Sequence, residues 1–358
     1  MRKIDCFFFS VLMSCTVLGY AQQAAVPAAD SSATPAPSAV APAPVHISMD
    51  VQVSDKEGKP VGGLEPTDFT LLDDDQPRRI LGFRRTDGLT GNKFDLPTEA
   101  IIVLDAVNIP YQGVTQLRLQ LQRYLRQNGG QLTVPTSVFV YTSRGLMVQP
   151  APSKDGNAIA KTLDTSVGTV RASDSSAGDY GQAEQFQSSI KTIKGIAENE
   201  AHKPGRKLLI WLGSGWPLLD SIKFLKSNQN ESIYFSDIVE VSKKLREARI
   251  TVDAVFTLIG SDTKLWGAYV KPVKEFHKAD AGNLALQVLA RQTGGRVIEP
   301  SNDVPSLIDQ CIADVGPYYT LVFTPPQAAH SDEYHDLKVT VAQPGVTVRS
   351  ISGYYDQP

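Results

Sequence analysis

Hydrophobic positions along the chain follow two different periods, and the change from one to the other divides the sequence into regions. Residues 47–53 alternate apolar and polar side chains, which is the period-two pattern of a half-buried strand. Between residues 100 and 315, short apolar runs alternate with stripes of helical spacing. From Tyr318 onward the period returns to two. The pattern therefore predicts a region of β-strands, then a region of alternating strands and helices, and then a second region of β-strands.

The middle region predicts a mostly parallel sheet with helices on both faces, because strand and helix patterns alternate along it. It has the character of a doubly wound, Rossmann-like fold. Predicted strands cover 100–105, 136–142 with 145–148 beside it, 207–212, 251–256 and 296–298. Predicted helices cover 114–125, 157–163, 185–201, 236–249, 284–292 and 303–315.

The two flanking β regions are each too short to form a stable sheet alone. We therefore predict that residues 45–95 and 317–358 assemble into one split β-sandwich, with residues 96–316 inserted between them as a separate α/β domain. The acidic run Asp73-Asp74-Asp75 lacks the spaced ligands of a known calcium loop, and we expect it to be a solvated turn.

The N-terminus has the pattern of a secretory signal. Arg2 and Lys3 precede an apolar run that ends near Leu18, and Gly19-Tyr20-Ala21 offers a cleavage site, so residues 1–21 are interpreted as a signal peptide. Lipoprotein processing at Cys15 is the alternative, although Met13 fits that pattern poorly. Residues 22–44 are rich in Ala, Pro and Ser and predict a disordered tether. We expect a periplasmic or extracellular location.

Composition narrows the classes of partner and of fold stabilisation. The formal net charge is -3, so nothing favours a nucleic acid or an anionic membrane surface. The chain has three cysteines, and Cys311 alone lies outside the predicted signal peptide. Without an internal disulfide, the exported fold must be stabilised by its core. We expect Cys311 to be a small buried core residue.

Polar residues at the ends of predicted strands supply the candidate site. The apolar run 101–104 ends in Asp105, as when a central strand delivers a carboxylate to the edge of an open sheet. Asn108 follows in the next turn, and Ser214 follows the strand 207–212. Asp179 lies in a loop rich in Ser, Gly and Asp, and Trp216 belongs either to a recognition surface or to the packing against the sheet. These five residues are the predicted ligand-binding set.

Other catalytic patterns are missing from the sequence. Residues 105–111 contain no glycine, which disfavours a phosphate-binding loop, and Leu212-Gly213-Ser214-Gly215 is not a nucleophile elbow. The histidines form no helical metal-binding pair, and we expect surface or structural roles for His330 and His335. We therefore expect a protein that is not an enzyme.

The chain resembles the von Willebrand factor type A (VWFA)-related secreted proteins of acidobacteria. The resemblance rests on the sheet pattern and on flanking signatures at 53–64 with Asp68-Phe69, at 318–321, at 334–339 and at 353–355. It implies a type A domain, which often holds Mg²⁺ through an Asp-x-Ser-x-Ser motif, a Thr from a later loop and a second Asp. The metal then captures a carboxylate of a protein ligand.

This implied metal site is degenerate in the present sequence. Asp105 matches the first ligand, but Val107 and Ile109 stand where the serines belong. Gly213-Ser214-Gly215 stands where the second Asp belongs, and the threonine falls at Thr165, at Thr169 or at a serine of 173–176. Because Mg²⁺ requires near-ideal octahedral oxygen ligands, we do not expect tight Mg²⁺ or Ca²⁺ binding.

Three functions remain after this comparison. The first is a secreted, non-enzymatic module of the adhesion type that binds an extracellular or periplasmic protein, or a surface polymer, at the sheet edge. The second is a metal-dependent adhesin with a non-standard site at Asp105, Asn108 and Ser214. The third is a hydrolase that uses the cleft at the same edge, with Ser214 or Asp105 as its reactive group.

Overall fold

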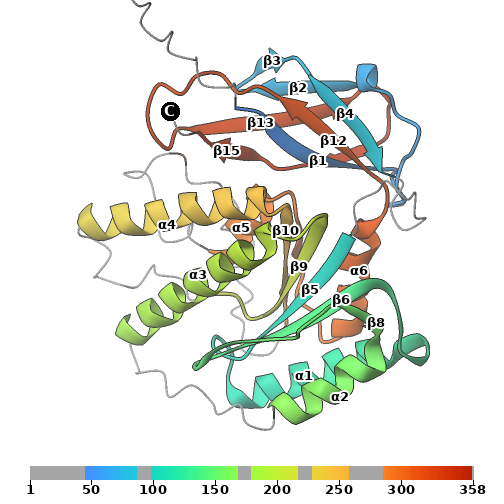
Figure 1. Cartoon of the computed structure of the whole chain (residues 1–358), viewed down its shortest axis with the longest axis vertical. Coiled ribbons are helices and arrows are strands. Elements are labelled where there is room, and N and C mark those ends of the chain that lie inside the picture. The colour runs from blue at the N-terminus through green and yellow to red at the C-terminus, as the bar shows by residue number, and fades with distance from the viewer. Residues whose placement is uncertain are drawn as a thin grey trace, which may run out of the picture. The chain divides into compact units, whose positions relative to one another are not determined.

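The computed structural model describes residues 45–86, 98–167, 179–216, 228–257, 274 and 285–356 (Figure 1). Within these ranges, the side chains of residue 111 and of residues 165–167, 179–180 and 228–234 are not described. The predicted signal peptide, the alternative site at Cys15 and the tether 22–44 lie outside the described residues. The same holds for Thr169 and for the serines of 173–176.

A seven-stranded sheet forms the centre of the α/β part, with the order β11-β10-β9-β5-β6-β7 and β8 paired to β6 (Figure 1). β5, β6, β9, β10 and β11 are parallel, whereas β7 and β8 run antiparallel to β6. This confirms the predicted mixed α/β class with a mostly parallel sheet. The strands are β5 (Thr98–Asp105), β6 (Gln131–Thr142), β7 (Gly145–Val148), β8 (Ser153–Asp155), β9 (Arg206–Gly213), β10 (Ile250–Phe256) and β11 (Val297–Ile298).

Helices cover both faces of this sheet, so its central strands are apolar on both sides. One face, which carries Val103 and Trp211, packs on α3, α4 and α5. The other face, which carries Ile102 and Leu104, packs on α1, α2 and α6. The helices are α1 (Tyr111–Arg126), α2 (Gly156–Val167), α3 (Asp179–Ala201), α4 (Asn228–Glu247), α5 (Leu286–Gln292) and α6 (Val304–Ile312).

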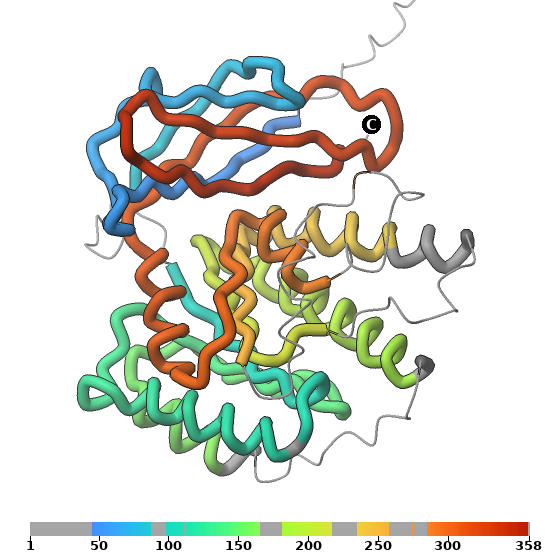
Figure 2. The backbone as a smooth tube through the Cα atoms, turned by 180° about the vertical axis from the view of Figure 1, so that it is seen from behind, coloured from blue at the N-terminus to red at the C-terminus, as the bar shows by residue number. Residues whose placement is uncertain are grey.

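Two four-stranded antiparallel sheets combine strands from both ends of the described chain, blue beside red in Figure 2. Their orders are β14-β1-β12-β4 and β15-β13-β2-β3, and their apolar sides share one core. The pairing joins β1 to β12 and β2 to β13. The strands are β1 (Ile47–Ser54), β2 (Phe69–Asp73), β3 (Gln76–Arg78), β4 (Gly82–Thr86), β12 (Tyr318–Phe323), β13 (Tyr334–Val341), β14 (Thr347–Arg349) and β15 (Gly353–Tyr355).

The antiparallel sheets contact the N-terminal ends of the central strands. Asp50 of β1 accepts hydrogen bonds of 3.0 and 3.1 Å from Arg249, just before β10, and lies 4.0 Å from Arg206 at the start of β9. Thr320 of β12 also donates to Asp50. The opposite edge of the sheet, where the parallel strands end, is therefore the edge away from these contacts.

Several predicted details change in the structure. α3 begins at Asp179 and α4 at Asn228, each earlier than predicted, because the helices continue beyond their apolar stripes. The prediction of a solvated acidic turn is wrong for Asp73, whose side chain is fully buried, although Asp74 and Asp75 are exposed. His335 is also buried, which excludes the predicted surface role. Cys311 is fully buried, as predicted.

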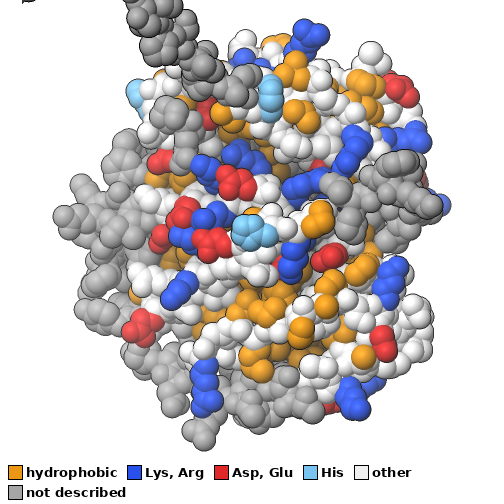
Figure 3. Space-filling model, in the orientation of Figure 1, with side chains coloured by type: hydrophobic (Ala, Val, Ile, Leu, Met, Phe, Trp, Pro, Cys, Tyr) orange, Lys and Arg blue, Asp and Glu red, His pale blue; other side chains and the backbone are white. Residues whose placement is uncertain are grey.

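Among the described residues, no helix combines the length and the apolar character needed to cross a membrane. Figure 3 shows acidic and basic side chains interspersed on the visible face, which agrees with the small net charge of the sequence.

Candidate functional site

The candidate site lies where the strand order of the sheet reverses direction. From β5 the chain moves to β6 on one side, and it later enters β9 on the other side of β5. In an open α/β sheet, a crevice forms outside the carboxyl ends of two neighbouring strands whose following connections leave in opposite directions. Here those ends are Asp105 and Gly213, and we call the place between them the switch point.

Asp105 accepts four hydrogen bonds at the switch point. Its Oδ1 accepts from the backbone N–H groups of Val107 at 3.0 Å and Asn108 at 2.9 Å. Its Oδ2 accepts from Asn108 Nδ2 at 2.7 Å and from the indole Nε1 of Trp211 at 2.9 Å. A carboxylate offers about four lone-pair positions. The donors therefore use the full accepting capacity of Asp105.

The environment of Asp105 is closed to solvent. The residue is 0% exposed, and burial raises its pKa, while the hydrogen bonds from Asn108, Trp211 and Val107 act in the opposite direction. Gly213 of β9 makes room for it, because a Cβ at that position would lie 3.0 Å from the Cβ of Asp105. Gly213 thus allows close packing against Asp105.

A polar network continues from Asp105 through Asn108. Asn108 Nδ2 also donates to Ser189 Oγ of α3 at 3.0 Å, and the Ser214 hydroxyl donates to the carbonyl oxygen of Asn108 at 2.8 Å. The Tyr141 hydroxyl of β6 lies 3.4 Å from the same Ser189 hydroxyl. The structure therefore brings together Asp105, Asn108 and Ser214 from the predicted set.

Trp216 has no hydrogen bond to the described members of this network. Trp216 is buried and makes edge contacts with Trp211 and Phe186, so it packs against the sheet. Among the described residues, neither the Nε1 of Trp216 nor the buried Asn108 Oδ1 has a hydrogen-bond partner. Asp179 is the first residue of α3, and its side chain lies outside the described part.

Three members of the network, Trp211, Ser189 and Tyr141, were not predicted from the sequence. Trp211 lies two residues before Gly213 on β9, and therefore on the same face of the sheet as Asp105. Because Trp211 lies within an apolar run, the sequence gives no indication that its indole N–H donates a hydrogen bond to Asp105. Ser189 has no local signal, because its contact depends on how α3 packs against the sheet.

This arrangement limits the chemistry of the site. An ion at Asp105 would have to displace the Asn108 or Trp211 donors, and neither Val107 nor Ile109 offers a side-chain oxygen. The Ser214 hydroxyl donates its proton to the main-chain carbonyl of Asn108, and not to a described basic side chain. Asp105 organises the loop that follows β5.

Comparisons with known proteins found solved structures of low similarity. No family model matches, and no curated protein matches. Solved structures with some similarity include human COPII-coat protein Sec24c (14% identity, TM-score 0.34, covering 77% of this chain and 46% of that chain). They also include a mutant of the PilB minor pilin from Streptococcus sanguinis (12% identity, TM-score 0.35, covering 63% of this chain and 62% of that chain).

The pilus adhesin SpaC of Lactobacillus rhamnosus GG is also similar (8% identity, TM-score 0.34, covering 83% of this chain and 49% of that chain). The chain thus spans about half the length of Sec24c and of SpaC.

Proposed function

We propose that this chain is an exported, non-enzymatic binding module with a type A-like α/β domain. In this proposal, the switch point between β5 and β9 binds a protein or a surface polymer without a metal ion. The observation that carries the proposal is the saturated carboxylate of Asp105, which accepts four protein donors where a metal-dependent type A domain would offer a free ligand.

The choice of edge follows from the connections between strands and helices. Residues 214–227 link β9 to α4, and residues 257–285 link β10 to α5, so both connections leave from the carboxyl ends of the parallel strands. In open α/β sheets, ligands bind outside the carboxyl ends of the strands, at the point where the strand order reverses. The opposite edge is in contact with the antiparallel sheets through Asp50 and Arg249.

The test is retention of envelope material from the native cell by the purified chain, with and without Mg²⁺. Ser214→Glu places a bulky charge at the switch point, and we expect it to abolish retention. Ser54→Glu makes the same change at a half-buried serine of β1 and serves as the matched control. Equal retention by both variants, or retention that requires Mg²⁺, would contradict the proposal.

A further inference from the structure

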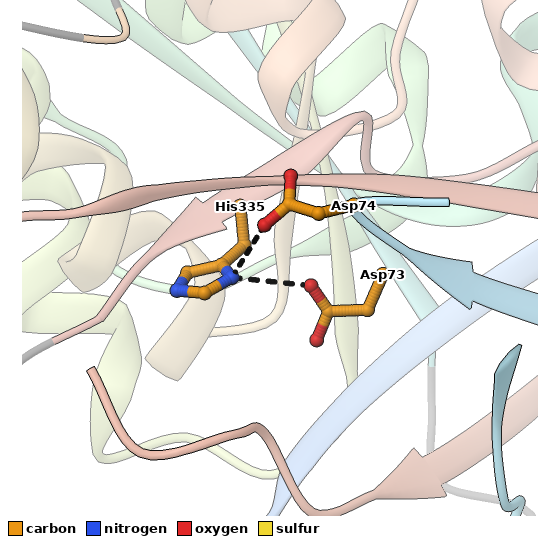
Figure 4. A group of neighbouring side chains, drawn as sticks. All are labelled: Asp73, Asp74 and His335. Atoms are coloured by element: carbon orange, nitrogen blue, oxygen red, sulfur yellow. Dashed lines mark hydrogen bonds and ion pairs between the residues drawn. The ribbon is translucent and has the colours of Figure 1, made fainter. Parts of the chain in front are cut away.

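A second group of polar side chains lies among the antiparallel strands, far along the sequence from the switch point. Asp73 ends β2, Asp74 follows in the turn to β3, and His335 is near the start of β13. His335 Nδ1 lies 2.8 Å from Asp74 Oδ2 and 3.2 Å from Asp73 Oδ1 (Figure 4). Within the described ranges, these three side chains meet the geometric requirement for a shared metal ion.

The spacing of the three atoms suits a small divalent ion. Zn²⁺ binds imidazole nitrogen and carboxylate oxygen at about 2.0–2.2 Å, so two ligands of one tetrahedral ion lie about 3.3 Å apart. The separation of 3.2 Å between His335 Nδ1 and Asp73 Oδ1 is close to that value. The separation of 2.8 Å between His335 Nδ1 and Asp74 Oδ2 is shorter, so the exposed Asp74 side chain moves outward by about half an ångström when an ion binds. One nitrogen and two oxygens leave a fourth position for water. Asp74 provides the route to solvent, because 49% of its side chain is exposed.

Each carboxylate has one oxygen anchored by a donor from outside the cluster. The Tyr354 hydroxyl donates to Asp73 Oδ2 at 2.9 Å, and the backbone N–H of Asp336 donates to Asp74 Oδ1 at 3.0 Å. The other oxygen of each carboxylate then faces the imidazole. Outer donors of this kind orient the ligands of metal sites.

The imidazole is fixed in place by its neighbours. The ring of His335 stacks on Tyr354 with a centroid separation of 4.9 Å and an interplanar angle of 8°. Both His335 and Asp73 are buried, so two of the three ligands are held in place before an ion arrives. Such preorganisation reduces the entropy lost on binding.

The cluster places two carboxylates against a single ring nitrogen. Arg78 Nε lies 3.4 Å from Asp73 Oδ2 and offsets one carboxylate. A neutral imidazole carries one proton, which two carboxylate oxygens face at hydrogen-bonding distance. A divalent cation would satisfy both oxygens and the ring nitrogen together, because it attracts all three lone pairs at once.

We propose that Asp73, Asp74 and His335 form a Zn²⁺ site that fastens the β2–β3 turn to the start of β13. β2 comes from the N-terminal part of the described chain and β13 from its C-terminal part, so the ion joins the two ends of the β structure. Cys311 is buried and free, and among the described residues no disulfide makes that link.

The test is calorimetric titration of ZnCl₂ into the untagged full chain, together with thermal unfolding at increasing Zn²⁺. We expect one ion per chain and a melting temperature that rises with the Zn²⁺ concentration. Cobalt(II) provides a second readout, since ligation at this site produces visible absorption bands. Asp74→Asn and His335→Gln should each weaken Zn²⁺ binding at least about tenfold, which is the minimum loss seen when even an outer-shell partner is removed.

Asp75→Asn is the matched control. Asp74 and Asp75 are adjacent and exposed, and both have a positive φ (49° and 61°) that asparagine adopts readily, so either variant retains the turn. Asp75→Asn should bind Zn²⁺ as the unmodified chain does. The proposal is overturned if no heat and no thermal shift are observed. It is equally overturned if Asp74→Asn and His335→Gln bind as tightly as Asp75→Asn, because the ion would then lie elsewhere.

Discussion

Trp211 and Trp216 lie close together near Asp105 and differ in the hydrogen bonding of their indole N–H groups. Trp211 Nε1 donates to the buried carboxylate, whereas Trp216 Nε1 has no hydrogen-bond partner in the part of the chain that the structure describes. The two rings contact each other edge to face at a centroid separation of 5.6 Å, and both are buried. A comparison of the two residues therefore separates the contribution of one hydrogen bond to the free energy of unfolding from the contribution of ring burial.

We expect Trp211→Phe to lower the free energy of unfolding by about 1.5–3 kcal/mol more than Trp216→Phe does. The first change leaves Asp105 Oδ2 with one donor fewer and raises the pKa of that carboxyl further, while the second removes an N–H that donates to no described residue. Urea denaturation of both variants measures the difference. Equal losses would mean that the bond to Asp105 contributes nothing.

The sequence identified part of this site because three residues carry a local signal. Asp105, Asn108 and Ser214 each follow a recognisable strand, and strand ends gather at one edge of a parallel sheet. The donors that saturate Asp105 depend on which strand lies beside β5 and on the packing of α3. The hydrophobic periodicity of the sequence specifies neither the neighbour of β5 nor the packing of α3. The contacts of Trp211 and Ser189 could therefore not be predicted from it.

At the level of single elements, the alternation of inward and outward residues along β2 explains why the prediction from acidic composition failed at Asp73. Phe69, Leu71 and Asp73 alternate along one face of β2, and all three are buried. Composition favoured a solvated acidic turn, but the period of two extends the inward face to Asp73. Its partner His335 was unpredictable, because the pairing of β2 with β13 joins distant parts of the chain.

β10 carries an acidic residue whose burial makes the folded state sensitive to pH. Asp253 is 1% exposed, and burial raises its pKa from 3.8 to about 6, although the backbone N–H of Arg296 donates to it. Protonated Asp253 therefore favours folding. Its contribution is complete below pH 3.8 and is lost as the pH rises through about 6.

We expect the chain to lose up to about 3 kcal/mol of unfolding free energy through Asp253 between these pH values, since each pKa unit corresponds to about 1.4 kcal/mol. Asp253→Asn should remove this dependence and should be more stable than the unmodified chain at pH 8. Denaturation curves from about pH 3.5 to pH 8 cover the whole range between the unfolded and the folded pKa and test it, with the exposed Asp75→Asn as control. A parallel pH dependence in all three proteins would contradict the assignment.

At the scale of the whole described unit, a buried charge cluster connects the antiparallel sheets to the α/β part. Arg206 is 4% exposed, and desolvation by burial lowers its pKa, whereas Asp50 nearby acts to raise it. Asp50 also holds Arg249 through two hydrogen bonds. Loss of the carboxylate would leave a guanidinium buried without its nearest negative charge.

We expect Asp50→Asn to lower the free energy of unfolding by about 3 kcal/mol, because breaking a buried ion pair strands the remaining charge. Differential scanning calorimetry should show a lower melting temperature than for Glu57→Gln, an exposed residue in the turn after β1. Identical melting of the two variants would show that this cluster does not couple the two parts.

The central claim is that the switch point works without a metal, because the fold itself saturates Asp105. Calorimetric titration of Mg²⁺, Mn²⁺ and Ca²⁺ into the Asp74→Asn chain, in which the Asp73–His335 cluster is disabled, tests this directly. We predict no binding heat with any of the three ions. A micromolar site that disappears on further substitution of Asp105→Asn would contradict the claim.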